Sequence, residues 1–150
     1  MFRKLFCISS AFMLLLVGVP AIAQSLAPQS LQGAEVVTPE KAAELHGSGA
    51  HFFDLRPSEL YARGHVPGAV RMPFKEKSER TPDFDPSRDR FGLMKLPAER
   101  SASLVFYGEG VDTWPAYKAA AIAVMAGYQN VYWLREGFDA WSSRGLPVER

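Results

Sequence analysis

Cysteine is almost absent from this chain of 150 residues, and its single thiol, Cys7, lies near the amino terminus. One thiol cannot form an intramolecular disulfide, so the disulfide framework that supports many small exported domains is excluded. The chain also lacks an excess of either charge, with 17 Lys and Arg against 16 Asp and Glu. No basic stripe runs along it, which argues against a nucleic-acid-binding protein. The length suits one domain with a core of its own.

Long apolar runs are missing too, except near the amino terminus. Arg3 and Lys4 precede a run that is densest over residues 11–17, and small residues follow at Ala21 and Ala23. This is the pattern of a secretory signal peptide, with cleavage predicted after Ala23. Polar residues and proline interrupt the run, which disfavours an uncleaved membrane span. We therefore expect residues 1–23 to be removed, the protein to be periplasmic or secreted without membrane attachment, and the mature chain to have no cysteine.

Short apolar runs and helical patterns alternate along the rest of the chain. Residues 24–35 are polar, with Pro28 and Gly33, and we interpret them as a flexible linker to a domain over residues 36–149. Strands are expected at residues 36–37, 52–55, 69–72, 103–107 and 131–134, and helices after Thr38, over 58–62, from Trp114–Pro115 to Gly127, and over 138–143. This alternation predicts an α/β fold, a doubly wound sheet of about five mostly parallel strands with helices on both faces.

Residues 74–100 break this alternation. They are dense in charge and proline and poor in apolar periodicity, with scattered apolar side chains at Phe84, Phe91, Leu93 and Met94. We expect an irregular excursion on the surface that has room for a short helix.

Four separated motifs stand out: Phe-Asp-Leu-Arg-Pro at 53–57, Gly-His-Val-Pro-Gly-Ala at 64–69, the strand–loop–helix pattern from Leu104 to Ala121, and the stretch from Gly127 to Val148. Together they resemble the rhodanese (sulfurtransferase-like) family. One such motif alone would be weak evidence, whereas four in the family's order and spacing are strong evidence for the fold. The resemblance implies a rhodanese-like doubly wound domain whose active-site loop follows the strand at 103–107.

The resemblance places Gly108 where rhodaneses carry their catalytic cysteine. The family's chemistry needs a thiolate that takes up sulfane sulfur and passes it on. Gly108 has no side chain, and Thr113 stands where one branch of the family has a second cysteine. We therefore expect no cysteine-persulfide chemistry, and no chemistry of the phosphatases that share the fold, because they need the same cysteine.

The loop that follows the strand remains the candidate binding site, since backbone N–H groups at a helix start can cradle an anion. Glu109 and Asp112 oppose an anionic ligand there unless Arg71 or Arg135 offsets their charge. Thr113 is expected to cap the next helix. Trp114 is the side chain expected to cover a small apolar or cationic ligand. The candidate loop residues are Gly108, Glu109, Gly110, Val111, Asp112, Thr113 and Trp114.

Four residues before the loop are expected to support it structurally rather than to catalyse. Arg56 and Glu59 are predicted to form a partly buried charge pair beneath the loop, near Asp54 at the end of its strand, because buried charges need partners. His65 is predicted to be a structural hydrogen-bonding residue within its turn.

Neither a metal nor a cofactor is expected, because His46, His51 and His65 do not have a metal-ligand spacing. We favour a non-catalytic module that binds an unidentified protein or small ligand through the loop face. One alternative is an enzyme, sulfurtransferase-type or hydrolytic, that works without cysteine. Another is a structural component of an exported complex that docks through residues 74–100. Enzymatic activity stays open, with the missing thiol arguing against it.

Overall fold

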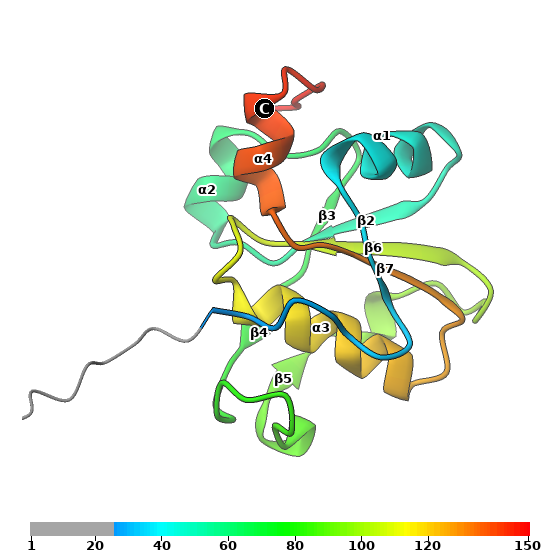
Figure 1. Ribbon diagram of the computed structural model, residues 1–150, viewed down its shortest axis with the longest axis vertical. Coiled ribbons are helices and arrows are strands. Elements are labelled where there is room, and N and C mark those ends of the chain that lie inside the picture. The colour runs from blue at the N-terminus through cyan, green and yellow to red at the C-terminus, as the bar shows by residue number, and fades with distance from the viewer. Residues whose placement is uncertain (1–25) are drawn as a thin grey trace, which may run out of the picture.

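A five-stranded parallel sheet organises residues 26–150, which are the residues that the computed structural model describes (Figure 1). The strand order is β1–β7–β6–β2–β3, and every neighbouring pair is parallel. The strands are β1 Glu35–Val36, β2 His51–Asp54, β3 Val70–Arg71, β6 Ser103–Tyr107 and β7 Asn130–Leu134. The predicted fold class is therefore confirmed. The proposed signal peptide and Cys7 lie outside the described residues.

Helices cover both faces of the sheet (Figure 1). On one face, α1 (Pro39–Gly47) and α4 (Gly137–Ser143) contribute Ala42 and Trp141 to a core cluster. On the other face lies α3 (Trp114–Met125), and α2 (Ser58–Arg63) joins β2 to β3. Within residues 26–150, no helix has both the length and the apolarity that crossing a membrane requires.

Strand β6 lies at the centre of the core. Leu104 and Phe106 belong to the cluster beneath α3, whereas Val105 and Tyr107 belong to the cluster beneath α1 and α4. All four are fully buried. A strand that is apolar on both faces is typical of a parallel sheet covered on both sides. For this reason β6 is a continuous apolar run in the sequence.

The segment before β1 packs against the domain, which corrects the expectation of a flexible linker for its described part. Ala27 is 2% exposed and joins the core cluster beneath α3. Arg135, at the end of β7, donates from Nε to the Pro28 carbonyl at 2.7 Å and from Nη2 to the Ala27 carbonyl at 2.9 Å. The acceptors in these contacts are backbone carbonyls, which every residue has. The side chains of this segment therefore do not reveal the contacts.

Residues 74–100 are more ordered than their composition predicts. β4 (Phe74–Lys75) and β5 (Arg90–Phe91) form a two-stranded antiparallel sheet. Two 3₁₀ turns, η1 (Pro86–Arg88) and η2 (Leu93–Lys95), lie in the segment for which the sequence left room for a short helix. Most of the segment is irregular, as expected, and the strand pair is the part that was missed, because strands of two residues are too short to show a period in sequence.

A buried charge cluster fixes this hairpin to α3. Lys118 is completely buried, and its Nζ donates to the Ser78 hydroxyl at 2.7 Å and to the Ser78 carbonyl at 3.1 Å. Its Nζ also lies 3.2 Å from Glu76 and 3.7 Å from Asp89. Burial alone would raise the pKa of Asp89, but hydrogen bonds from the Ser78 hydroxyl and from the amides of Lys77 and Ser78, together with the Lys118 charge, lower it.

The cluster predicts that Lys118→Met lowers the free energy of unfolding by about 3 kcal/mol, because the buried Asp89 loses its cation and the partly buried Glu76 keeps only Arg80. The measurement is urea denaturation at neutral pH. Lys75→Met on the exposed face of the same hairpin is the control and should change stability by less than about 0.5 kcal/mol. Because folding lowers the pKa of Asp89, its contribution is complete above the ordinary value of 3.8 and is lost as the pH falls below it. Equal effects of the two substitutions would contradict this account.

Candidate functional site

The loop of residues 108–113 joins the carboxyl end of β6 to the start of α3. From β6 the chain passes through α3 to β7 on one side, whereas β2 leads through α2 to β3 on the other side. The carboxyl ends of β6 and β2 therefore flank the point where the winding direction changes, which is where open α/β sheets bind ligands. Asp54 and Arg56, at the end of β2, lie beside this loop.

The Thr113 hydroxyl occupies the inside of the loop. Its Oγ1 accepts hydrogen bonds from the amide of Glu109 at 3.1 Å and from the amide of Gly110 at 3.2 Å. Thr113 is the residue before α3, but its side chain makes no capping hydrogen bond to that helix. The expected cap is thus wrong, because the hydroxyl turns back and satisfies loop amides that would otherwise face the site.

Gly108 and Thr113 are sterically coupled. A Cβ atom placed on Gly108 would overlap the Thr113 side chain, with Oγ1 at 2.7 Å and the methyl carbon Cγ2 closer still. Carbon atoms in contact lie about 3.5–4.0 Å apart. The loop therefore holds a threonine side chain in the volume that any side chain at position 108 would need.

Gly137, in the first turn of α4, packs directly against the backbone of the loop. Its φ is +69°, and a Cβ there would overlap the carbonyl groups of Gly108 and Glu109. The close approach lets two α4 amides donate to the loop, from Phe138 to the Gly108 carbonyl at 2.8 Å and from Asp139 to the Glu109 carbonyl at 3.0 Å. Glycine is needed at position 137 because only it tolerates both this φ and this distance.

Arg56 links the loop to β2. Its guanidinium is 3% exposed and forms a bidentate pair with Asp54, with Nη2 at 2.7 Å and Nε at 3.0 and 3.1 Å. Nη1 reaches Glu109 of the loop at 3.2 Å. Burial lowers the pKa of Arg56, but the hydrogen bonds and charge of Asp54 outweigh it and raise the pKa, so the group stays charged. Burial raises the pKa of the nearby Tyr107. The Tyr107 hydroxyl accepts a hydrogen bond from the Val66 amide.

The partner of Arg56 within the loop is Glu109 and not Glu59. Glu59 is exposed and accepts a hydrogen bond from the Ser58 hydroxyl at 3.1 Å. It lies in the first turn of α2, where the chain has already turned away from the end of β2. The expected Arg56–Glu59 pair is therefore corrected to an Arg56–Asp54–Glu109 cluster.

His65 makes contacts of a structural kind. Its ring stacks on Tyr61 at 3.8 Å, and its Nδ1 lies 3.0 Å from the Tyr61 carbonyl. Its backbone pairs with Glu149 in an isolated β-bridge, which ties the turn at 64–68 to the carboxyl-terminal segment.

Trp114 is buried, which corrects its expected role as a lid over a ligand. It is 2% exposed and meets Tyr117 edge to face at 5.4 Å in the core beneath α3. The loop side chains that reach the surface are Val111, Asp112 and, in part, Glu109. Arg135 is bound to the segment before β1, and Arg71 forms no ion pair with a loop carboxylate among the described residues. The acidic charge of the loop face is therefore offset mainly by Arg56.

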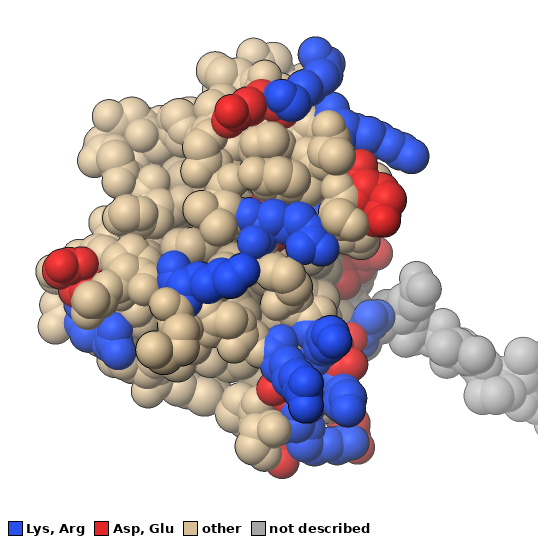
Figure 2. Space-filling view, turned by 180° about the vertical axis from the view of Figure 1, so that it is seen from behind, with Lys and Arg blue, Asp and Glu red and all other residues tan. Residues whose placement is uncertain are grey.

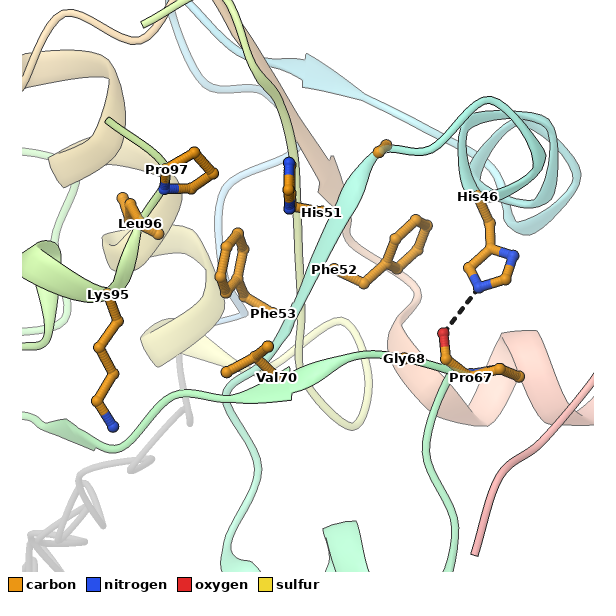
Figure 3. A pocket seen from close by; sticks show the side chains of 11 residues that line it. His46, His51, Phe52, Phe53, Pro67, Gly68, Val70, Lys95, Leu96 and Pro97 are labelled. Carbon is orange, nitrogen blue, oxygen red and sulfur yellow. Dashed lines mark hydrogen bonds between the residues drawn. The ribbon is translucent and has the colours of Figure 1, made fainter. Parts of the chain in front are cut away.

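A pocket of about 490 Å³ lies elsewhere, along β2 towards its amino end (Figure 3). Phe52, Phe53 and Val70 line it, with Lys95 on one side and His46, which donates to the Pro67 carbonyl at 2.7 Å, on the other. His51 also faces it, whereas His65 lies in the turn near Glu149. Within residues 26–150, no group of three His, Cys, Asp or Glu side chains is placed to hold a metal ion.

The family is decided by comparison with known proteins. A model of the rhodanese-like domain matches residues 38–144. The chain belongs to the rhodanese-like family. Thiosulfate sulfurtransferase GlpE of Pseudomonas entomophila is 29% identical over 107 residues, covering 71% of this chain and 84% of that protein. A crystal structure of the Alr3790 protein from Anabaena matches with a TM-score of 0.54 at 21% identity, covering 75% of this chain and 80% of that one.

Other rhodanese-like relatives are much longer than the matched part. An HTH-type transcriptional regulator of Mycobacterium tuberculosis is 33% identical over 96 residues, which are 64% of this chain and 36% of that protein. Thiosulfate sulfurtransferase YnjE of Escherichia coli is 33% identical over 95 residues, which are 61% of this chain and 21% of that protein. The chain thus spans about a third of the first and a fifth of the second of these two relatives.

The contact between positions 108 and 113 predicts that Gly108→Ala lowers the free energy of unfolding by about 2 kcal/mol through overpacking. In a Thr113→Gly background the same substitution should cost at least about 1 kcal/mol less, because the overlapping atoms are gone. Gly110→Ala is the matched control, since a Cβ there has only ordinary contacts at 3.8 and 3.9 Å. Urea denaturation of the double-mutant cycle measures the coupling, and additive costs would show that the two positions do not compete.

Proposed function

We propose that this protein is an exported rhodanese-like domain that has no sulfurtransferase activity and acts as a binding module through its loop face. The observation that carries the proposal is the Gly108–Thr113 pair. Position 108 offers no nucleophile, and the space beside it holds the Thr113 side chain. A fold shared with sulfurtransferases does not by itself supply their chemistry.

Thr113 is a poor substitute for the missing thiolate. A hydroxyl oxygen has two lone pairs, and both accept amide hydrogens from Glu109 and Gly110. The two interactions also remove the amides from any anionic substrate. A sulfurtransferase function, suggested by the names of relatives such as GlpE, therefore has neither a nucleophile at position 108 nor the amides of Glu109 and Gly110 to use.

The exposed part of the loop favours a protein partner over a small anion. Val111 is 36% exposed and Asp112 is exposed beside it, while Glu109 retains 40% of its side-chain exposure. Asp139 of α4 adds a further exposed carboxylate close to Gly110. An apolar centre with acidic side chains around it suits a partner surface that presents apolar and basic groups.

We expect the protein to be inactive in thiosulfate-to-cyanide sulfur transfer, and Gly108→Cys to remain inactive because Thr113 displaces the new side chain. The double variant Gly108→Cys/Thr113→Gly should gain sulfur transfer, since it supplies a thiol and frees the loop amides. Thiocyanate formation measures the activity, and circular dichroism verifies that each variant is folded.

Cys7→Ser is the control for a contribution from the chain's natural thiol. Sulfur transfer by the unaltered protein that survives Cys7→Ser would refute the loss of catalysis. Activity of Gly108→Cys alone would show that Thr113 does not obstruct the site.

The binding half of the proposal predicts that a photo-crosslinking residue in place of Val111 forms one discrete adduct in an extract of the native host. Asp112→Lys should remove that adduct, because it reverses the charge beside the contact. The same crosslinker in place of Gln129, which is exposed at the opposite end of the sheet, is the control. Equal adducts from both positions, or an adduct insensitive to Asp112→Lys, would contradict binding through the loop.

A further inference from the structure

The β4–β5 hairpin separates its charges between two faces. Side chains alternate along a strand, so residues two apart share a face. In the chain order Phe74-Lys75-Glu76-Lys77 and Arg88-Asp89-Arg90-Phe91, the aromatic and acidic residues lie at least partly buried, and the basic residues are exposed. The hairpin therefore points its carboxylates inward and its cations outward.

The inward face is satisfied within the molecule. Phe74 and Phe91 meet at a ring distance of 5.8 Å across the two strands. Glu76 and Asp89 both lie near the Lys118 ammonium, at 3.2 and 3.7 Å. Glu76 also pairs with the exposed Arg80 at 2.8 Å. Among the described residues, neither carboxylate forms an ion pair with the basic side chains at positions 75, 77, 88 and 90.

The outward face carries four cations, of which Arg88 is near enough to Asp85 for its charge to help lower the pKa of that carboxyl. Lys75 lies directly opposite Arg90, and the Lys77 amide donates to Asp89 at 2.6 Å, which places Lys77 next to Arg88. Among the described residues none of the four forms an ion pair, and like charges directly opposite each other destabilise a ladder. The exposed acidic residues of this segment, Glu79, Asp83 and Asp85, lie in the connection between the strands. Figure 2 shows basic side chains gathered at the lower edge of the molecule, with acidic side chains around them.

An exposed apolar side chain follows the basic ladder. Met94 in η2 is 96% exposed. Its neighbour Lys95 is exposed too, and its stem passes over Gly92, where a Cβ would meet it at 3.6 Å. We call Lys75, Lys77, Arg88, Arg90, Met94 and Lys95 the hairpin patch. An exposed apolar side chain within a few residues of the cations of β5 fits a partner that is anionic and apolar together.

We propose that the hairpin patch binds the surface of an anionic lipid bilayer. The basic side chains would contact lipid phosphates, each strengthening binding by its attraction to the negative surface. Met94 would enter the boundary between headgroups and acyl chains, as apolar side chains of peripheral proteins do. The exposure of Met94 favours a bilayer as the partner, because binding to nucleic acid or to an acidic protein segment would need only the cations. This differs from the sequence-based expectation of no membrane contact, and it is independent of the function proposed for the loop.

The test is sedimentation of the full chain with phosphatidylcholine vesicles, with and without phosphatidylglycerol. Binding to the neutral vesicles reports any contribution of the apolar residues 11–17, so the informative quantity is the preference for anionic vesicles. We expect such a preference, decreasing as salt rises. Lys75→Glu/Arg90→Glu should reduce the affinity for anionic vesicles at least about tenfold, and Met94→Ser about threefold. Arg63→Glu/Lys41→Glu, an equal charge change on exposed residues of α1 and α2, should reduce it no more than about twofold.

Equal affinity for neutral and anionic vesicles would overturn the proposal, as would equal losses in the two charge-reversal variants. Duplex DNA or polyglutamate, added at matched charge, separates a bilayer from other anionic partners. If either polymer releases the protein from the vesicles when polymer charges are fewer than lipid charges, the patch belongs to that class of polymer and the proposal is overturned. Circular dichroism and urea denaturation verify that the variants are folded.

Discussion

The packing of Thr113 against Gly108 is the constraint on which the chemistry of this domain depends. Glycine at position 108 leaves room for the threonine side chain, and the threonine hydroxyl then accepts the amides of Glu109 and Gly110. Loop amides left without a partner would each cost about 1–3 kcal/mol if buried. Thr113 offsets that cost from within the chain, so the loop keeps its shape without an anion or a thiolate at its centre. The two residues therefore form one unit, because Thr113 in this conformation fills the space that a side chain at position 108 would need.

Two buried cations hold the irregular parts of the molecule in place. Arg56 ties β2 to the loop through Asp54 and Glu109, and Lys118 ties the β4–β5 hairpin to α3 through Glu76 and Asp89. Buried ion pairs add little net stability because desolvation opposes their attraction, but they tolerate few alternative arrangements when every donor has a partner. Their role here is to fix the position of segments that have little apolar surface of their own. The same arrangement draws the hairpin's carboxylates inward and leaves its cations outside.

Sequence predicted the regular elements well because their side chains repeat with the period of the element. The strand at 103–107 and the helix start at Trp114 are where the sequence placed them, and Thr38 caps α1 through the Lys41 amide. The contacts that define the site were not predictable in this way. The choice of Glu109 over Glu59 as a partner of Arg56 depends on a loop 53 residues away, and the burial of Trp114 depends on how α3 meets Tyr117 and the sheet. The hairpin did have a signal, the alternation of Lys75-Glu76-Lys77 with Arg88-Asp89-Arg90, but strands of two residues made it look like solvated charge.

The Gly108–Thr113 unit also explains how the loop keeps its shape with no side chain at position 108. Removing a cysteine alone would leave loop amides oriented towards an empty centre, a destabilising arrangement that gives no reason to retain the loop geometry. With Thr113 inside, the same backbone is a satisfied structural element, supported by Gly137 and by the α4 amides of Phe138 and Asp139. A cysteine at position 108 would therefore need a second change at position 113, because a side chain at 108 alone collides with Thr113. Under the proposed function, the exposed side chains of Val111 and Asp112, and not the interior of the loop, are where a partner would make contact.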